Sequence, residues 1–322
     1  MRVLDALEGG RPRISIEVVP PARGGDLDSI KAAVEAVMPW EPAFVSVTDH
    51  AGGRAWVDGA GGPRLVALRT RPGTLGTAVA LREAFRVATV PHLVALGMDR
   101  LAVEDLLIDL HHAGFHDVFA VRGDDRGEAQ NQAEAGGAGG GEGRHKDATE
   151  LVRHIADLNA GRYTPPAGGK PTSFVVGVAG YPEKHFAAPN LESDLDRLEE
   201  KVSAGASFIV TQMVFDAAPY RDFVAALRGR GITVPVIPGI KPLLRSSSLS
   251  LIPRTFFVTI PQGLVRALGE ARTPAEERAA GLAWAEGLAR DLLDAGAPCL
   301  HWFTMGRGET MRGLLEGLFG KA

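Results

Sequence analysis

The stretch from Val175 to Asp216 combines buried strands with polar side chains that could bind a ligand. Its runs FVVGVA and SFIVTQ are rich in Val, Ile and Phe, and a helical pattern from Leu191 to Ala204 separates them. This order predicts one parallel βαβ unit whose strands are covered on both faces. Ligands bind at the carboxyl ends of such strands, which is where Tyr181, His185 and Gln212 lie. We therefore expect the functional site at this edge.

A second candidate is a carboxylate inside an apolar run. Glu17 stands in ISIEVVPP, and a carboxylate is costly to bury unless it is paired or protonated. One interpretation is a structural ion pair with Arg122 or Arg307. The other is general acid catalysis, because burial raises the pKa of a carboxyl group toward neutrality. We favour the general acid.

Polar residues follow other apolar runs as well. In VRGDD, Gly123 would let the backbone turn close to a ligand and Asp124 could accept hydrogen bonds from it, although a solvated turn is the alternative. His92 lies near a strand end, where a hydrogen-bonded core histidine is more common than a catalytic base. The strand-end residues are Glu17, Thr48, His92, Arg122, Gly123, Asp124, Tyr181, Gln212, Gly239 and Arg307. Their convergence on one rim is what a binding site requires.

Eight apolar, β-branched runs alternate with helical patterns along the chain. They are Ile14 to Val19, Phe44 to Thr48, Thr89 to Ala95, Asp117 to Val121, Phe174 to Ala179, Phe208 to Gln212, Val234 to Pro238, and Cys299 to Thr304. A long helix is predicted from Pro274 to Ala295, with Thr273 as its N-cap and Gly296 as its stop. This alternation predicts an α/β fold, a (β/α)8 TIM barrel that forms a single domain over residues 1–322.

Two irregular segments interrupt this pattern. The connection between the second and third runs contains several glycines before the helix-like Leu75 to Phe85, and we expect a surface excursion there. Residues 126–143 are dominated by Gly, Ala, Glu and Gln, with almost no large apolar side chain whose burial could offset the entropy of ordering. We predict that this segment, after the fourth strand, is a mobile loop on the catalytic rim.

Composition argues against several classes of partner. The formal charge is −4 and no Lys/Arg stripe is present, so neither nucleic acid nor an anionic membrane is expected. Cys299 is the single cysteine, the amino terminus lacks an apolar signal, and no run is long enough to span a membrane. We expect a cytoplasmic protein with small-molecule partners, and a homo-oligomer is compatible with the sequence. Neither a metal-binding spacing nor a G-x-G-x-x-G fingerprint in a strand-turn-helix context is found.

Several motifs together resemble the methylenetetrahydrofolate reductase family. The match includes ISIEVVPP, FVSVT, VPHLV, FAVRGD, ATELV, GVAGYPEKHFAAPN, KVSAGA, IVTQMVFD, VPVIPGIKP and HWFTMGRGE, in the family's order. GYPEKH followed by AGA and TQ-x-x-FD is highly specific, whereas RGD and PHL are not. The resemblance, to the shorter bacterial-type members with a single catalytic barrel, implies an FAD-dependent reduction of 5,10-methylenetetrahydrofolate to 5-methyltetrahydrofolate. NADH or NADPH would be the electron donor, and the product would supply methyl groups for methionine synthesis.

The resemblance also implies roles for individual residues. Glu17 would be the general acid that helps to open the methylene bridge, and Asp124 would act beside the flavin and the pterin. Gln212 would hydrogen-bond the pterin or the nicotinamide, and Arg307 would face the folate. The implied FAD contacts are Thr48, His92, Arg122, Gly123, Asp124, Ala148, Tyr181, His185, Ala188, Asp194 and Lys201.

This chain departs from the family pattern at several of these places. Asp49 and Asp147 stand where the family usually has tyrosines near the flavin, and Arg197, Glu200 and Ser248 replace other usual contacts. Weaker flavin binding is therefore expected. The alternative function, a non-catalytic folate- or flavin-binding subunit, is disfavoured because Glu17, Asp124 and Gln212 are all retained.

Overall fold

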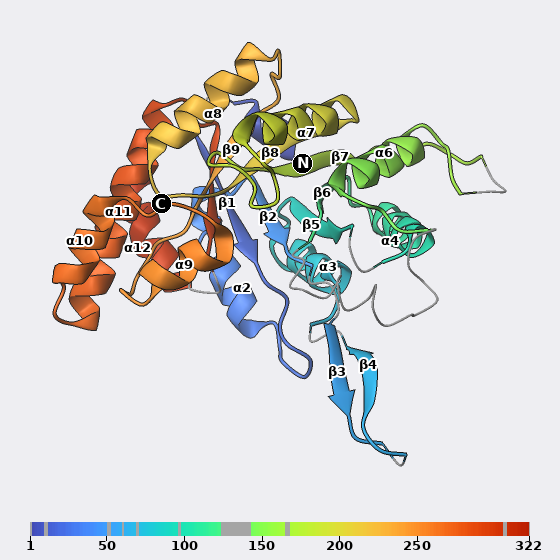
Figure 1. Ribbon diagram of the computed structural model, residues 1–322, viewed down its shortest axis with the longest axis horizontal. Coiled ribbons are helices and arrows are strands. Elements are labelled where there is room, and N and C mark those ends of the chain that lie inside the picture. The colour runs from blue at the N-terminus through green and yellow to red at the C-terminus, as the bar shows by residue number, and fades with distance from the viewer. Residues whose placement is uncertain are drawn as a thin grey trace.

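Eight parallel strands close into a barrel within the part of the chain that the structure describes (Figure 1). The computed structural model describes residues 2–9, 12–49, 53–59, 61–68, 71–95, 98–123, 143–164, 168–304 and 308–321. The barrel strands are β1 (Arg13–Val18), β2 (Phe44–Val47), β5 (Thr89–Val94), β6 (Asp117–Val121), β7 (Val175–Gly180), β8 (Ala206–Val214), β9 (Val236–Ile240) and β10 (Cys299–Phe303). Around the barrel the order is β1-β10-β9-β8-β7-β6-β5-β2. The predicted TIM barrel is confirmed, and each strand falls on one of the eight predicted runs.

Helices surround the barrel, and most of them cover the outward faces of its strands (Figure 1). They are α2 (Asp28–Glu35), α3 (Thr74–Phe85), α4 (Arg100–His112), α6 (Ala148–Asn159), α7 (Leu191–Ser203), α8 (Ala217–Gly229), α9 (Ser248–Phe256), α10 (Gln262–Glu270), α11 (Pro274–Asp294) and α12 (Gly308–Phe319), with a short 3-10 turn η1 (Met38–Trp40). The predicted ends of α11 are confirmed. The Thr273 hydroxyl accepts from the backbone N–H of Glu276 at 3.2 Å, and Gly296 leaves the helix with φ +82°.

Alternation of side chains along the strands, interrupted by register shifts in β8, separates the core outside the barrel from the core inside it. In β1, Ile14, Ile16 and Val18 pack against the helices, whereas Ser15 and Glu17 point into the barrel. A second apolar cluster fills the barrel interior and contains Phe44, Val90, Phe119, Phe208, Val210, Ile237 and Cys299. A polar residue at an inward position near the carboxyl end of a strand therefore faces the mouth of the barrel.

Aromatic rings fill the barrel below that mouth. The ring of Phe208 lies 6.0 Å from Phe44 and 6.2 Å from Phe119, centroid to centroid. Gly177 faces both Phe208 and Phe119, and a Cβ at this position would come within 2.3 Å of Phe208 and 2.6 Å of Phe119. The two rings occupy the volume that a side chain on β7 would otherwise take, so the floor of the mouth is apolar and closed.

The amino-terminal helix α1 (Val3–Leu7) covers the opposite end of the barrel. The backbone N–H of Val3 donates to Asp117 Oδ1 at 3.1 Å, and Arg13 Nε donates to the carbonyl of Ala6 at 3.2 Å. Burial raises the pKa of Asp117 to about 6, and the bond from Val3 opposes this rise. These contacts anchor the first residues of the chain to strands β1 and β6.

A two-stranded hairpin occupies the connection between β2 and α3. Strands β3 (Gly53–Val57) and β4 (Arg64–Leu68) pair in antiparallel register and project away from the barrel (Figure 1). Trp56 lies near the tip and is 70% exposed. The predicted surface excursion is thus confirmed, but its strand content was not predicted, because the glycines around the two short runs hide their alternation.

A mobile loop was predicted over residues 126–143. Only Gly143 of this segment belongs to the described residues. That prediction and the assignment of residues 1–322 to one domain both stay predictions. None of the helices within the described ranges is long and apolar enough to cross a membrane.

Replacement of Gly177 by alanine is expected to destabilise the barrel. The added methyl group would overlap Phe208 and Phe119, and overpacking of this kind costs roughly 1–3 kcal/mol or more. Gly287→Ala is the matched control, because a Cβ there meets nothing within 4 Å and alanine favours a helix by about 1 kcal/mol. Urea unfolding should show a lower midpoint for Gly177→Ala and an equal or higher one for Gly287→Ala. Equal midpoints for Gly177→Ala and the wild type would contradict the role given to this glycine.

Candidate active site

Glu17 lies at the mouth of the barrel in a largely buried position. Its side chain is 18% exposed, and its Oε2 atom lies 3.8 Å from His92 Nε2. Burial raises the pKa of Glu17 to about 7, and the positive charge of Lys241 opposes this rise. Near neutral pH the carboxyl group is therefore present in both its protonated and its ionised form. A carboxyl group with a pKa near the working pH can donate a proton and then take up another from solvent.

The neighbouring strands hold the backbone of Glu17 in place. Glu17 is opposite Phe303 of β10 on one side and opposite Ser46 of β2 on the other. The Thr304 hydroxyl donates to the Glu17 carbonyl at 3.0 Å. Because Thr304, directly after β10, holds the Glu17 carbonyl, the Glu17 side chain projects from a fixed point on the rim.

His92 is the polar partner that the structure places beside Glu17. Its side chain is 9% exposed, and its ring packs against Phe119 with centroids 4.8 Å apart. Sequence reasoning proposed Arg122 or Arg307 as a structural partner of Glu17. The structure brings His92 to the carboxylate, since His92 faces inward from β5 at the level of the barrel mouth. Arg307 lies outside the described residues, so its pairing with Glu17 stays a prediction.

The turn after β7 forms the second part of the rim. The rings of Tyr181 and His185 meet edge to face with centroids 4.6 Å apart. The backbone N–H of His185 donates to Asp194 Oδ2 at 2.8 Å, and the N–H of Ala188 donates to the His185 carbonyl at 3.0 Å. Asp194 belongs to the first turn of α7, so this helix holds the turn against the barrel.

Positive charge gathers behind this turn. Lys201 Nζ donates to the carbonyl of Ala179 at 3.3 Å, and burial lowers the pKa of its ammonium while the Asp194 carboxylate opposes this effect. Burial also lowers the pKa of His185; Asp194 opposes this change, whereas the positive charges of Arg122 and Lys201 reinforce it. Cationic side chains at a partly buried rim are suited to an anion such as a pyrophosphate.

Gly123 and Gln212 show how the backbone shapes two further positions. Gly123 adopts a left-handed φ of +93°, which permits a tight turn directly after β6. Gln212 lies where the register between β8 and β9 shifts, and its Oε1 accepts from the N–H of Met213 at 2.9 Å. With the oxygen occupied by its own strand, the amide nitrogen is the atom of Gln212 that could donate to a ligand.

Helix α6 presents Ala148 at its first position, and Asp147 is its N-cap. The Asp147 carboxylate accepts from the backbone N–H of Glu150 at 2.9 Å. A tyrosine cannot make this bond. The aspartate that departs from the family pattern at this place therefore has a structural reason, which the sequence comparison alone did not provide.

A buried chain of hydrogen bonds anchors the segment before α6. His145 Nε2 and His154 Nδ1 are 3.0 Å apart, and His154 Nε2 lies 2.9 Å from Glu104 Oε2 on α4. An ionised carboxylate only accepts, so His154 donates to Glu104 and His145 donates to His154. Burial would raise the pKa of Glu104, but bonds from Thr164 and His154 outweigh it and lower that pKa. The sequence held no signal for this network.

Two predicted site residues, Asp124 and Arg307, lie outside the described residues, so the structure places neither of them. Thr48, His92, Arg122, Gly123, Tyr181, Gln212 and Glu17 all come from the carboxyl ends of barrel strands. Ala148, His185, Ala188, Asp194 and Lys201 come from the turns and helices that follow β6 and β7. Lys241, directly after β9, is a charged residue beside Glu17 that sequence reasoning did not select.

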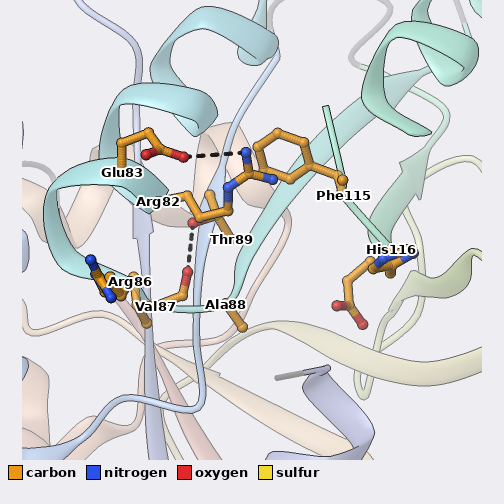
Figure 2. A pocket seen from close by; sticks show the side chains of 10 residues that line it. Arg82, Glu83, Arg86, Val87, Ala88, Thr89, Phe115 and His116 are labelled. Carbon is orange, nitrogen blue, oxygen red and sulfur yellow. Dashed lines mark hydrogen bonds and ion pairs between the residues drawn. The ribbon is translucent and has the colours of Figure 1, made fainter. Parts of the chain in front are cut away.

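A cavity of about 420 Å³ lies at the other end of the barrel, around the first residues of β5 and β6. Figure 2 shows Arg82 beside the ring of Phe115, 4.2 Å from its centroid, and paired with Glu83 at 3.5 Å. Asp117 in the same cavity already accepts from Val3. These polar groups are engaged by the protein itself, and the cavity is remote from Glu17. We assign no catalytic role to it.

The family model for methylenetetrahydrofolate reductase matches residues 2–318. The chain belongs to this family. It is 28% identical over 306 residues to methylenetetrahydrofolate reductase 1 of Schizosaccharomyces pombe, covering 94% of this chain and 45% of that protein. It is 24% identical to 5,10-methylenetetrahydrofolate reductase of Pectobacterium carotovorum, with 93% of this chain and 88% of that protein covered.

The chain spans about half the length of most of the eukaryotic reductases that it matches, including 51% of methylenetetrahydrofolate reductase (NADH) 1 of Arabidopsis thaliana. One solved structure, an uncharacterized protein from Clostridium thermocellum that binds two copies of 5-methyl-5,6,7,8-tetrahydrofolic acid, shares the fold. Its TM-score is 0.60 at 11% identity, with 98% of this chain and 97% of that chain covered. The predicted family is confirmed by the family model.

Loss of the Asp147 cap should destabilise the protein. Asp147→Ala removes the acceptor for the Glu150 N–H and is expected to cost about 0.5–2 kcal/mol, whereas Asp147→Asn keeps an acceptor and should stay close to wild type. Chemical denaturation of the three proteins measures the difference. If the asparagine variant is as unstable as the alanine variant, the bond to Glu150 is not the source of the effect.

Acid should weaken the fold through His145. Burial lowers its pKa from 6.5 to about 4, and the neighbouring His154 and Arg100 act in the same direction, while Glu150 and Asp147 oppose it. As the pH falls below 6.5 the unfolded chain binds a proton at His145 that the folded chain binds only near pH 4. The free energy of unfolding should therefore decrease as the pH falls from 6.5 to 4, and His145 should account for up to roughly 3 kcal/mol of this decrease. Above pH 6.5 His145 should not affect the free energy of unfolding.

Urea unfolding between pH 7.5 and pH 4.5 measures this dependence. The decline should be shallower in His145→Gln, and it should keep the wild-type slope in the control His112→Gln, whose side chain is exposed. Parallel slopes for wild type and His145→Gln would show that His145 is not responsible.

Proposed function

We propose that this protein reduces 5,10-methylenetetrahydrofolate to 5-methyltetrahydrofolate with FAD as its cofactor and NADH or NADPH as its electron donor. The observation that supports this function most directly is Glu17, a carboxyl group with a pKa of about 7 at the mouth of a barrel of this family. Reduction of the substrate requires an acid at the nitrogen that leaves when the methylene bridge opens. Few surface carboxyl groups hold a proton at neutral pH, because their pKa lies near 4.

Glu17 would donate its proton to the departing nitrogen of the methylene bridge. The C–N bond to that nitrogen breaks, the nitrogen takes the proton, and the carbon that stays on the other nitrogen becomes an iminium that can accept a hydride. The closed aromatic floor beneath Glu17 keeps water away from the carboxyl group on the barrel side. His92 Nε2 flanks the carboxylate, 3.8 Å from Glu17 Oε2.

The residues around the β7 turn fit the binding of FAD. Arg122 and Lys201 bring positive charge to a partly buried rim beside His185, and Gly123 allows the backbone after β6 to approach a ligand closely. Ala148 at the start of α6 and Ala188 in the β7 turn have small side chains, which would let a flat ligand come close to the backbone. When bound, the flavin would carry the hydride from the dinucleotide to the folate. Thr48, Tyr181 and Asp194 complete the proposed set of flavin contacts.

Gln212, Asp124 and Arg307 are the proposed folate contacts, with Asp124 also beside the flavin. The free amide nitrogen of Gln212 is the group that would donate to the pterin. The proposal includes both NADH and NADPH as donors, because relatives carry either name. A cytoplasmic location is in keeping with the single buried thiol of Cys299, and a homo-oligomer is compatible with the fold.

The experiment that tests this function compares wild type with Glu17→Gln in the two half-reactions. Glu17→Gln should still allow NADH or NADPH to bleach the flavin absorbance, but it should reduce folate about 10²–10⁴-fold more slowly, because an amide cannot donate the proton. In the wild type, folate reduction should decline as the pH rises through about 7, since Glu17 then loses its proton. Stopped-flow absorbance under anaerobic conditions measures both rates.

Equal slowing of both half-reactions would make Glu17 structural. A purified protein that binds flavin and folate but transfers no hydride to the folate would instead be a binding subunit, and the proposed activity would be wrong.

A further inference from the structure

Lys241 occupies a place in the barrel that brings its ammonium toward Glu17. It follows β9 directly, at the carboxyl end of that strand. Ile240 of β9 is opposite Trp302 of β10, so Lys241 is level with Phe303. Phe303 is in turn opposite Glu17 of β1. Lys241, Phe303 and Glu17 therefore stand at one level on three adjacent strands.

Alternation places the Lys241 side chain on the inner face. Ile240 belongs to the core between the barrel and the helices, and Gly239 before it faces the interior, where a Cβ would lie 2.6 Å from Phe303. The next residue, Lys241, returns to the inner face. Adjacent strands are about 4.8 Å apart, so two spacings separate the Cα atoms of Lys241 and Glu17 by about 10 Å. The two long side chains can cover most of this distance.

The ring of Phe303 does not stand between Lys241 and Glu17. It is turned down onto Gly239 and meets the ring of His301 edge to face, with centroids 5.2 Å apart. This packing is possible because Gly239 has no side chain. The ring thus lies one level below the two charged groups, and it forms an apolar floor under them rather than a wall between them.

The other described ionisable groups that face Glu17 come from β2, β5 and β10, and none of the three carries a permanent positive charge. His92 faces Glu17 from β5 at 3.8 Å, Asp49 follows β2, and His301 faces inward from β10 one level below. Burial lowers the pKa of His301 to about 3, so that imidazole is neutral at pH 7. Asp124 and Arg307 lie outside the described residues. Within the described part of the rim, Lys241 is the ammonium that acts on Glu17.

We propose that Lys241 is a positioning residue that sets the acid strength of Glu17 and thereby the pH range in which the folate is reduced. The part about folate rests on the function proposed above. Burial alone would hold the proton on Glu17 so tightly that it would be a poor donor, because donor strength falls as the pKa rises above the working pH. The ammonium stabilises the ionised carboxylate in a medium where water screens it poorly. Glu17 then both releases its proton and regains it near neutral pH.

The direct test is a titration of Glu17 that needs neither flavin nor folate. Proteins labelled with ¹³C at the glutamate side-chain carboxyl are followed by NMR from pH 5 to pH 9, and the Glu17 signal is identified by its absence in Glu17→Gln. In Lys241→Met the midpoint should rise by roughly 0.5–1 pH unit, since removal of the positive charge disfavours the carboxylate. Lys241→Arg, which keeps the charge, should titrate close to the wild type.

Two further variants complete the experiment. Lys170→Met removes an equal charge from an exposed position before β7, at the opposite end of the barrel, and should leave the Glu17 midpoint unchanged. Lys241→Gln is a second neutral replacement. Whichever neutral variant keeps the wild-type melting temperature is folded, and its Glu17 midpoint shows whether the charge of Lys241 matters. An unchanged midpoint in a folded neutral variant, or an equal shift in Lys241→Arg, would overturn the proposal.

The kinetic consequence is measured separately from the titration. In Lys241→Met the decline of folate reduction with rising pH should move upward together with the Glu17 midpoint, while flavin reduction by the dinucleotide keeps its pH profile. If the wild type reduces no folate at any pH, the proposed function fails, and the titration still decides whether Lys241 acts on Glu17. If the midpoint moves but the folate profile does not, Glu17 is not the acid for the folate, and the link between Lys241 and folate reduction is wrong.

Discussion

Each residue of a closed parallel barrel can point only toward the barrel axis or toward the helices, and this constraint determines where the functional side chains lie. In β1 it sends Ile14 and Ile16 outward and Glu17 inward. Because the eight strands run in one direction, their carboxyl ends share one rim, and inward side chains near those ends converge on one mouth. The convergence of Glu17, His92 and Lys241 follows from register alone and needs no special loop.

The filling of the barrel decides how strongly these groups interact. Phe44, Phe119 and Phe208 close the interior beneath the mouth, so Glu17 meets apolar surface on one side and other polar groups on the rim. A charge next to such a surface is poorly hydrated, and a single neighbouring cation then has a larger effect than it would have in water. Gly177 and Gly239 make this aromatic packing possible, since at each position an aromatic ring occupies the space that a side chain would need.

The sequence predicted the barrel because parallel strands covered on both faces appear as short, uninterrupted apolar runs. It also predicted the start of α11, since Thr273 and Pro274 form a recognisable cap. It did not reveal β3 and β4, whose glycine-rich surroundings resemble an ordinary loop. Nor did it reveal the bonds from His145 to His154 and from His154 to Glu104, because such pairings depend on how distant helices pack.

Some residues of the candidate site could be selected from the sequence, and others could not. Residues that directly follow apolar runs, such as Tyr181 and Gln212, were visible as candidates, and the specific GYPEKH motif supported them. Lys241 was not selected, because a lysine followed by proline after a short strand is typical of any surface turn. Its place next to Glu17 depends on the strand order β1-β10-β9, which joins segments that are far apart in the sequence. Arg122 directly follows β6 at the rim, and His92, which was expected to be a core histidine, lies beside Glu17.

The pairing of β1 with β10 also bears on how the protein is made. The strand that carries Glu17 is synthesised well before Phe303 and Thr304, which flank it on one side. Contacts between such distant segments form slowly, since the ends of a very long loop must meet. Until β10 pairs with β1, the buried environment that raises the pKa of Glu17 is incomplete. The pairing of β10 with β1 therefore completes both the closed barrel and the surroundings of Glu17.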